Sequence, residues 1–234
     1  CMTPENIRRL YDEWAPGYNR HYGTRQCRAE DLALSDLLTR LLRGKAQGTI
    51  LDLGCGTGLV KRLPIFADPK WSYVGVDASP GMLAHAAVQE GAKVTLVVGD
   101  IQDLHYPPEH DVVISTYGAL SYCAEVQQVL AGAYAALKPG GLAFFMPYSQ
   151  HQEDTGRYPT LCDGTVKGWW PESFEDILVA AGFSAVASVT WGSGRTRMLT
   201  RILPPERGAK RLIREILNPS CVQTPWFLAG WGRK

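Results

Sequence analysis

The sequence predicts a doubly wound α/β domain, in which a mostly parallel β-sheet carries helices on both faces. Short apolar runs of strand length alternate with amphipathic stretches of helical period along the chain. The run at 49–53 leads directly into a turn with three glycines, and the run at 72–76 is followed at once by Asp77. Strands buried on both faces read as continuous apolar runs, so this alternation indicates parallel strands joined by helical crossovers.

Two helices are expected before the first strand. Thr3 suits an N-cap and Pro4 the first helical position. The apolar residues of this helix recur at helical spacing: Ile7, Leu10, Tyr11 and Trp14. A second helix is expected at about 30–43, ended by Gly44. Its apolar face is formed by Leu34, Leu37, Leu38, Leu41 and Leu42.

The later elements follow the same alternation. Strands are expected near 49–53, 72–76, 94–98, 112–115 and 142–147, with helices between them. Pro64 shortens the helix after the glycine turn, whereas Ser79 and Pro80 begin the next helix as N-cap and first helical residue. Pro171 begins another helix. It is followed by a strand near 184–190, a helix at about 205–217 and a final strand at 226–231.

Composition indicates one domain without a strong preference for charged polymers. A chain of 234 residues with 45% apolar content can bury one large core. We expect a single domain over 1–234: amino-terminal helices at 1–45, a binding core at 46–147 and an acceptor-side part at 148–234. Its 24 basic and 23 acidic residues nearly cancel, which disfavours nucleic acid and anionic membranes as partners.

Cysteine usage and hydropathy predict a cytoplasmic protein. The six cysteines are far apart and form no Cys-x-x-Cys pair, which favours reduced thiols over disulfides or a zinc site. The apolar runs are too short to span a membrane, and no signal peptide is predicted.

The glycine turn and the acid that follows it predict a nucleoside site. Glycine permits positive φ and lets a ligand approach the backbone closely. An acid about 20 residues beyond such a turn accepts hydrogen bonds from ribose hydroxyls, and Asp77 lies 23 residues after Gly54. A dinucleotide fingerprint requires Gly-x-Gly-x-x-Gly, but Gly58 comes one residue early and Leu59 stands where the fingerprint has glycine.

The string Asp-Leu-Gly-Cys-Gly-Thr-Gly at 52–58 resembles motif I of the class I S-adenosylmethionine (AdoMet) dependent methyltransferases. Further segments similar to this family are 11–18, 76–83, 97–101 and the Leu-Lys-Pro-Gly-Gly turn at 137–141. Shorter segments at 14–16, 58–60, 79–83 and 118–121 are similar to the methyltransferase-like protein of the Williams–Beuren region. The resemblance runs from about residue 11 to residue 145.

The resemblance implies a Rossmann-like, seven-stranded sheet whose last strand is antiparallel, with the amino-terminal helices acting as a lid. Asp77 would bind the ribose, Asp100 would accept from the adenine amino group, and Tyr117 would lie near the reacting methyl. Asn19 replaces the acid usual at its position. The resemblance assigns to AdoMet Tyr11, Tyr18, Asp52, Gly54, Cys55, Gly56, Gly58, Asp77, Ala78, Met82, Asp100, Ile101, Thr116 and Tyr117.

Candidates for acceptor chemistry follow the fourth and fifth strands, since ligands of open α/β sheets bind at carboxyl ends of strands. They are His151, Tyr117 and Tyr148, as general base or as positioning groups. The alternatives are that His151 is an exposed loop residue and that Tyr117 packs on AdoMet. Trp169 and Trp170 either wall the acceptor pocket or belong to the core.

We expect a small-molecule acceptor methylated on oxygen or nitrogen, without a metal. Ser-Thr-Tyr-Gly follows the fourth strand, instead of the Asn/Asp-Pro-Pro-Tyr used for amide and adenine amino groups. The alternatives are a non-catalytic AdoMet-binding module and an RNA or protein methyltransferase. The basic segment at 195–214 is either a solvated face or a patch for an acidic substrate or carrier protein.

Overall fold

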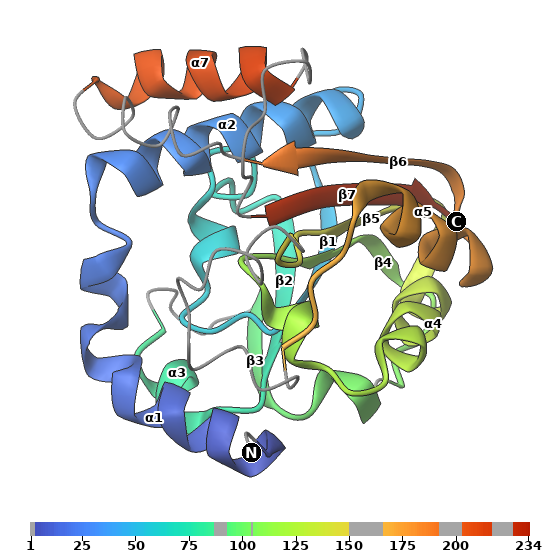
Figure 1. Ribbon diagram of the computed structural model, residues 1–234, viewed down its shortest axis with the longest axis horizontal. Coiled ribbons are helices and arrows are strands. Elements are labelled where there is room, and N and C mark those ends of the chain that lie inside the picture. The colour runs from blue at the N-terminus through green and yellow to red at the C-terminus, as the bar shows by residue number, and fades with distance from the viewer. Residues whose placement is uncertain (1–2, 87–92, 104, 150–165, 192–202, 217–226) are drawn as a thin grey trace.

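The computed structural model describes residues 3–86, 93–103, 105–149, 166–191, 203–216 and 227–234 (Figure 1). Its centre is a seven-stranded sheet of order β3-β2-β1-β4-β5-β7-β6. The strands are β1 (Gly48–Leu53), β2 (Trp71–Asp77), β3 (Val94–Val98), β4 (His110–Ser115), β5 (Leu137–Phe145), β6 (Ser184–Trp191) and β7 (Phe227–Arg233).

Strands β1 to β5 pair in parallel, and β7 lies antiparallel between β5 and β6. The doubly wound α/β prediction, with its antiparallel last strand, is therefore confirmed. Strand order reverses between β1 and β4, and a crevice opens at such a switch point in open α/β sheets. Strand β5 begins at Leu137 and not near residue 142 as predicted, because Leu137 already pairs with His110 of β4 and the Lys-Pro-Gly-Gly segment forms an irregularity before pairing resumes at Leu142.

The helices are α1 (Pro4–His21), α2 (Arg25–Leu41), α3 (Pro80–Ala84), α4 (Val126–Ala136), α5 (Pro171–Ala180) and α7 (Pro205–Ile216), with the 3₁₀ turns η1 (Leu59–Arg62), η2 (Ile101–Asp103) and η3 (Ala119–Tyr122). Helix α2 begins five residues before the predicted start at residue 30. Thr24 is its N-cap and accepts a hydrogen bond from the Cys27 N–H at 3.2 Å, a capping signal that the leucine pattern does not contain.

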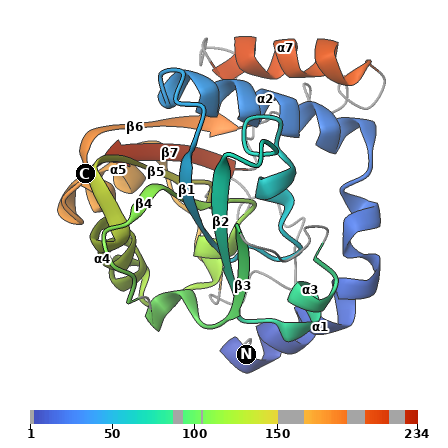
Figure 2. The same ribbon diagram turned by 180° about the vertical axis from the view of Figure 1, so that it is seen from behind.

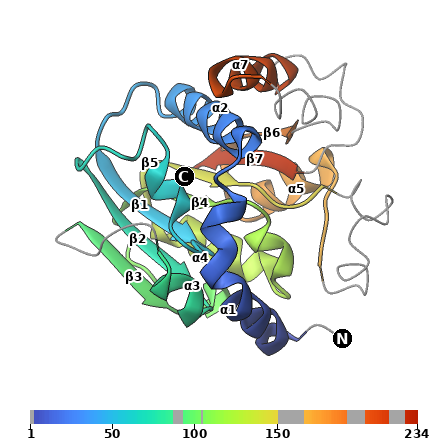
Figure 3. The same ribbon diagram turned by 90° about the vertical axis from the view of Figure 1, so that its left-hand side faces the viewer.

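Each face of the sheet is covered by helices, because successive strand residues point to opposite sides. Ile50 belongs to the core under α2 and α7, whereas its neighbours Leu51 and Leu53 belong to the core under α4 and α5. Helix α7 lies alongside α2 on the outside of the first core (Figures 1 and 2). Helix α1 instead reaches along the sheet to α3, as Figure 3 shows from the side.

Among the described residues, no helix combines the length and apolar content that crossing a bilayer requires. The division of 1–234 into helical lid, binding core and acceptor-side part stays a prediction.

One carboxylate ties the amino end of the sheet together. Asp111, 8% exposed at the start of β4, accepts hydrogen bonds from Lys45 after α2, from Lys138 in β5 at 3.0 Å and from the Thr49 N–H in β1 at 2.9 Å. Burial acts to raise the pKa of Asp111, but these hydrogen bonds outweigh it and hold the pKa well below its usual range.

Asp111→Ala should lower the free energy of unfolding by about 2–3 kcal/mol at pH 7, because charge-assisted hydrogen bonds to a buried carboxylate are lost. Since the folded-state pKa is depressed, this contribution is present above the unfolded pKa of about 4 and declines as the pH falls below it. Urea unfolding at pH 7 and pH 3 measures both effects. The control Asp36→Ala removes an exposed ion pair with Arg40 and should cost about 0.5 kcal/mol or less. A pH-independent difference between Asp111→Ala and the unmodified protein would contradict the assignment.

Candidate active site

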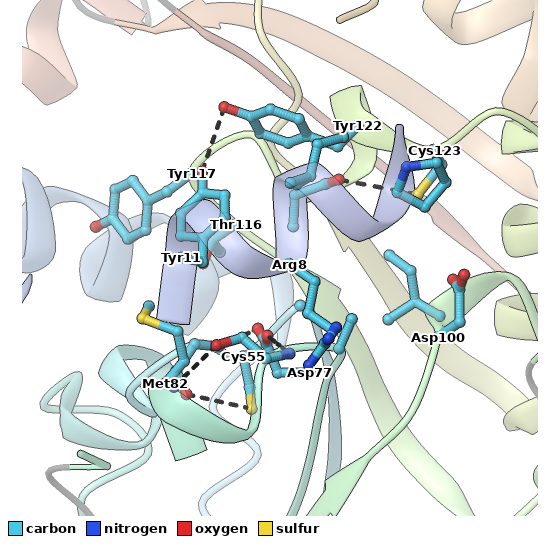
Figure 4. A pocket seen from close by; sticks show the side chains of 18 of the residues that line it. Arg8, Tyr11, Cys55, Asp77, Met82, Asp100, Thr116, Tyr117, Tyr122 and Cys123 are labelled. Atoms are coloured by element: carbon cyan, nitrogen blue, oxygen red, sulfur yellow. Dashed lines mark hydrogen bonds between the residues drawn. The ribbon is translucent and has the colours of Figure 1, made fainter. Parts of the chain in front are cut away.

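A cleft of about 980 Å³, counted with the solvent at its mouth, opens at the carboxyl ends of β1 to β4. Figure 4 shows Tyr11, Tyr117 and Tyr122 toward one end of this cleft and Asp100 and Cys123 toward the other. Its lining residues come from the turns after these strands and from α1: Pro4, Ile7, Arg8, Tyr11, Tyr18, Gly54, Cys55, Gly56, Leu59, Val60, Asp77, Ala78, Ser79, Met82, Asp100, Ile101, Gln102, Thr116, Tyr117, Ala119, Tyr122 and Cys123.

The glycine turn exposes main-chain atoms, without side chains, to the cleft. Gly54 and Gly56 have φ of +72° and +53°, a region that side chains disfavour. A Cβ on Gly54 would lie 2.3 Å from the Cβ of Ala119, so any other residue there would displace η3. Gly58, also predicted to bind the cofactor, lies outside the lining and begins η1 with φ of +75°.

Asp77 is held in a fixed orientation at the end of β2. Its Oδ2 accepts from the Gly56 N–H at 2.7 Å, and its Oδ1 accepts from the Ser79 N–H at 2.9 Å. Burial raises the pKa of Asp77, and these two hydrogen bonds oppose the rise. Each oxygen keeps a further lone pair, so the carboxylate can accept from two neighbouring hydroxyls, as in a ribose.

Helix α1 forms a roof that is fastened to the same turns. The Asp12 carboxylate accepts from the Ser79 hydroxyl at 2.6 Å and from the Gly81 N–H at 2.8 Å, at the start of α3. Asn19 accepts from the Thr57 hydroxyl at 2.6 Å and donates to the His85 carbonyl at 3.1 Å. The amide that replaces the usual acid therefore joins the roof to the glycine loop.

Asp52 lies behind the turn and not in the cleft lining. Its Oδ2 accepts from the Tyr73 hydroxyl at 2.6 Å, whereas its Oδ1 is buried with no hydrogen-bond partner among the described residues. Burial raises the pKa of Asp52 to about 7, against the hydrogen bond from Tyr73, and nearby Asp77 adds to the rise. An unpartnered buried carboxylate oxygen is unusual and favours a cationic partner.

Several lining residues were missed in the sequence. Pro4, Ile7 and Arg8 lie on the same face of α1 as Tyr11, at the i, i+3, i+4 and i+7 positions. Extending this helical period backward from Tyr11 would have found them. Gln102 and Cys123 carried no comparable signal, because short 3₁₀ turns place them, whereas Tyr122 was a candidate from its position after the fourth strand.

Tyrosines dominate the end of the cleft near β4. Tyr117 has φ of +55° and donates its hydroxyl to the Asp31 carboxylate at 2.8 Å. Tyr11 donates to the Tyr122 hydroxyl at 3.2 Å. Tyr148 lies outside the cleft lining, with its ring centroid 6.1 Å from that of Tyr122.

The remaining predicted residues lie outside the cleft lining or outside the part of the chain that the structure describes. His151 lies outside the described residues, so its role stays a prediction. Trp169 packs on Phe174 with ring centroids 5.7 Å apart, whereas Trp170 is 40% exposed. Of the basic segment at 195–214, the described and exposed cations are those of α7: Arg207, Lys210 and Arg211.

Comparisons with known proteins agree with this geometry. The family described as "Methyltransferase domain" matches residues 50–141. Malonyl-acyl-carrier-protein O-methyltransferase of Priestia megaterium is 28% identical over 149 residues, which are 63% of this chain and 53% of the relative. Methyltransferase-like protein 27 of Homo sapiens is 46% identical over 81 residues, which are 33% of this chain and 31% of the relative. The chain thus spans about half, or less, of the length of these curated relatives.

Among solved structures, a chain from the complex between the Haloferax volcanii Trm112 methyltransferase activator and a methyltransferase superposes with a TM-score of 0.65. It is 21% identical, and the match covers 97% of this chain and 96% of that one, which shows a shared fold. The sheet order is that of the Rossmann-like methyltransferase fold, and these matches, together with the glycine turn beside Asp77, support a class I AdoMet-dependent methyltransferase domain.

Proposed function

We propose that the protein transfers the methyl group of AdoMet to an oxygen or nitrogen atom of a small molecule. The observation that carries this proposal is the fixed Asp77 carboxylate in the middle of a cleft with Asp100 toward one end and Thr116 and Tyr117 toward the other. This order suits a nucleoside joined to an amino acid. A dinucleotide would need a helix N-terminus facing its phosphates, but a left-handed Gly58 and a 3₁₀ turn follow this loop.

The residues present fit AdoMet in its charge as well as its shape. Asp77 would accept from the ribose hydroxyls, and Asp100 and the buried Ile101 would contact the adenine. The unpartnered Oδ1 of Asp52 is the group suited to the ammonium, through water or after a small movement of the turn. When bound, AdoMet supplies an electrophilic methyl carbon on a sulfonium.

The chain's own contribution is alignment and exclusion of water. Helix α1 covers the cleft with Tyr11 and Tyr18, and Asp12 and Asn19 hold it to the turns beneath. Alignment of a nucleophile in line with the methyl accounts for much of the rate in such reactions. General-base or positioning roles for His151, Tyr117 and Tyr148 stay predictions.

A small-molecule acceptor and a cytoplasmic location belong to the same proposal. The nearly balanced charge of the whole chain favours a small-molecule acceptor over nucleic acid. The exposed cations of α7 are a candidate contact for an acidic partner. In the described part of the chain, no group of three or more His, Cys, Asp or Glu side chains is arranged to hold a metal ion.

Asp77→Ala should weaken AdoMet binding by roughly 10–150-fold, because at least one hydrogen bond to a charged acceptor is lost. Calorimetry with AdoMet measures the change, and a thermal unfolding scan verifies that the variant is folded. The control Asp103→Ala removes an exposed acid at the end of η2, outside the cleft lining, and should bind AdoMet like the unmodified protein. Unchanged affinity in Asp77→Ala, or preferential binding of NAD, would refute the cofactor assignment.

Binding of AdoMet should weaken as the pH falls from 7 to 6, by at most about tenfold per unit. A carboxyl with a raised pKa is protonated below that pKa, and it must lose this proton before it can pair with the ammonium of AdoMet. Calorimetry in buffers of different ionisation enthalpy should detect proton release. Asp52→Asn should bind AdoMet more weakly and lose this pH dependence. If the variant keeps the same pH dependence, Asp52 is not its source.

Incubation with AdoMet labelled on its methyl group and a metabolite extract should place label in the small-molecule fraction. The Asp77→Ala variant should transfer correspondingly less label at limiting AdoMet. Label confined to RNA or protein would overturn the acceptor class. Binding of AdoMet without transfer in any fraction would favour the non-catalytic module.

A further inference from the structure

The end of the cleft near β4 is walled by aromatic rings. Tyr11, Tyr18, Tyr117 and Tyr122 line it, and Figure 4 shows three of them grouped there. The ring of Tyr11 contacts two of the others edge to face: its centroid is 6.3 Å from that of Tyr18 and 5.9 Å from that of Tyr122. The ring of Tyr117 instead contacts Tyr22, with centroids 5.6 Å apart. Such a group presents electron-rich faces and hydroxyl oxygens in place of an aliphatic wall.

Carboxylates lie behind these rings. The Asp31 carboxylate accepts from the Tyr117 hydroxyl at 2.8 Å, and its neighbour Glu30 is 5% exposed. Burial raises the pKa of Asp31, and the hydrogen bond from Tyr117 opposes the rise. A phenol that donates to a carboxylate has a more electron-rich ring, so this contact strengthens the attraction of Tyr117 for a cation.

Positive charge is scarce on the same walls. Among the described lining residues, Arg8 is the one cation, and its guanidinium pairs with Glu5 and Asp12 on α1. Arg62 acts on Asp31 through space and lies outside the lining. An anionic acceptor would therefore enter next to buried carboxylates without a free cation to pair with on these walls.

We infer that the acceptor of this enzyme is an amine that enters the tyrosine-lined end of the cleft as a cation, with Asp31 setting the negative potential behind Tyr117. Before transfer the ammonium would lose one proton to water, and the lone pair so freed would form the new nitrogen–carbon bond while the carbon–sulfur bond of AdoMet breaks. The inference rests on the proposed function and narrows its acceptor to one class. A cation over an aromatic face gains more when water is excluded, and the roof formed by α1 supplies that exclusion.

A matched set of probes tests the charge preference without turnover. Choline, its neutral carbon analogue 3,3-dimethyl-1-butanol and the anion 3,3-dimethylbutanoate have similar shapes but carry charges of +1, 0 and −1. Titrated into the protein saturated with S-adenosylhomocysteine and followed by NMR or calorimetry, choline should bind about 3- to 30-fold more tightly than the alcohol. The anion should bind most weakly. Equal or tighter binding of the alcohol or the anion would overturn the inference.

Three variants test which residues cause the preference for choline over the neutral alcohol. Asp31→Asn keeps an acceptor for the Tyr117 hydroxyl but removes the charge, and Tyr122→Leu removes one ring; each should lower the ratio of choline to alcohol affinity. Asp36→Asn removes an acid from the exposed side of the same helix and should leave the ratio unchanged. If the ratio falls equally in Asp36→Asn, the net charge of the protein attracts choline, and the tyrosine-lined end with Asp31 does not.

The two proposals fail in different ways. Failure to bind S-adenosylhomocysteine would refute the proposed function, whereas normal binding with no preference for choline would refute only the amine. In the labelling experiment, the methylated product should be retained by a cation exchanger at pH 5. Labelled product that passes through at that pH would contradict an amine acceptor.

Discussion

The site depends on one carboxylate held by two backbone N–H groups. Asp77 receives the Gly56 N–H from the turn after β1 and the Ser79 N–H from the start of α3. The Ser79 hydroxyl donates in turn to Asp12 of α1, so Asp77, the glycine turn and the roof form one hydrogen-bonded chain. Ser79 therefore links Asp77, through its N–H, to the roof, through its hydroxyl.

Acids whose pKa values are raised lie in the lining of the cleft and behind it. Asp52, Asp77 and Asp31 have pKa values raised by burial, so each would be stabilised by a cation. A ligand with a sulfonium and an ammonium supplies such charge on the cofactor side. Under the inference above, an amine acceptor would supply it at the tyrosine-lined end. A buried carboxylate is costly by itself, so a positively charged ligand offsets part of that cost when it binds.

Much of the fold and of the cofactor side could be predicted from the sequence. The turn at 54–58, Asp77 and the capping pair of Ser79 and Pro80 depend on local backbone rules, and the structure places them as local rules require. Where the local signal was incomplete, prediction failed by a few residues. Thr24 begins α2 five residues early because a polar cap lies outside the leucine pattern, and β5 begins early because Leu137 pairs with His110 of β4 ahead of the Pro-Gly-Gly turn.

The sequence by itself determined the sheet class, the nucleoside-type turn and the acid beside it, because each is encoded by residues close together along the chain. Only the tertiary structure decided which side chains share the cleft. Asp12 and Ser79 are 67 positions apart and Tyr117 and Asp31 are 86 apart, yet each pair is hydrogen-bonded. Contacts at such separations arise from how helices pack across a sheet edge, and no local period records them. The charge and aromatic character of the acceptor side therefore became visible only when α1 and α2 were folded over the ends of the strands.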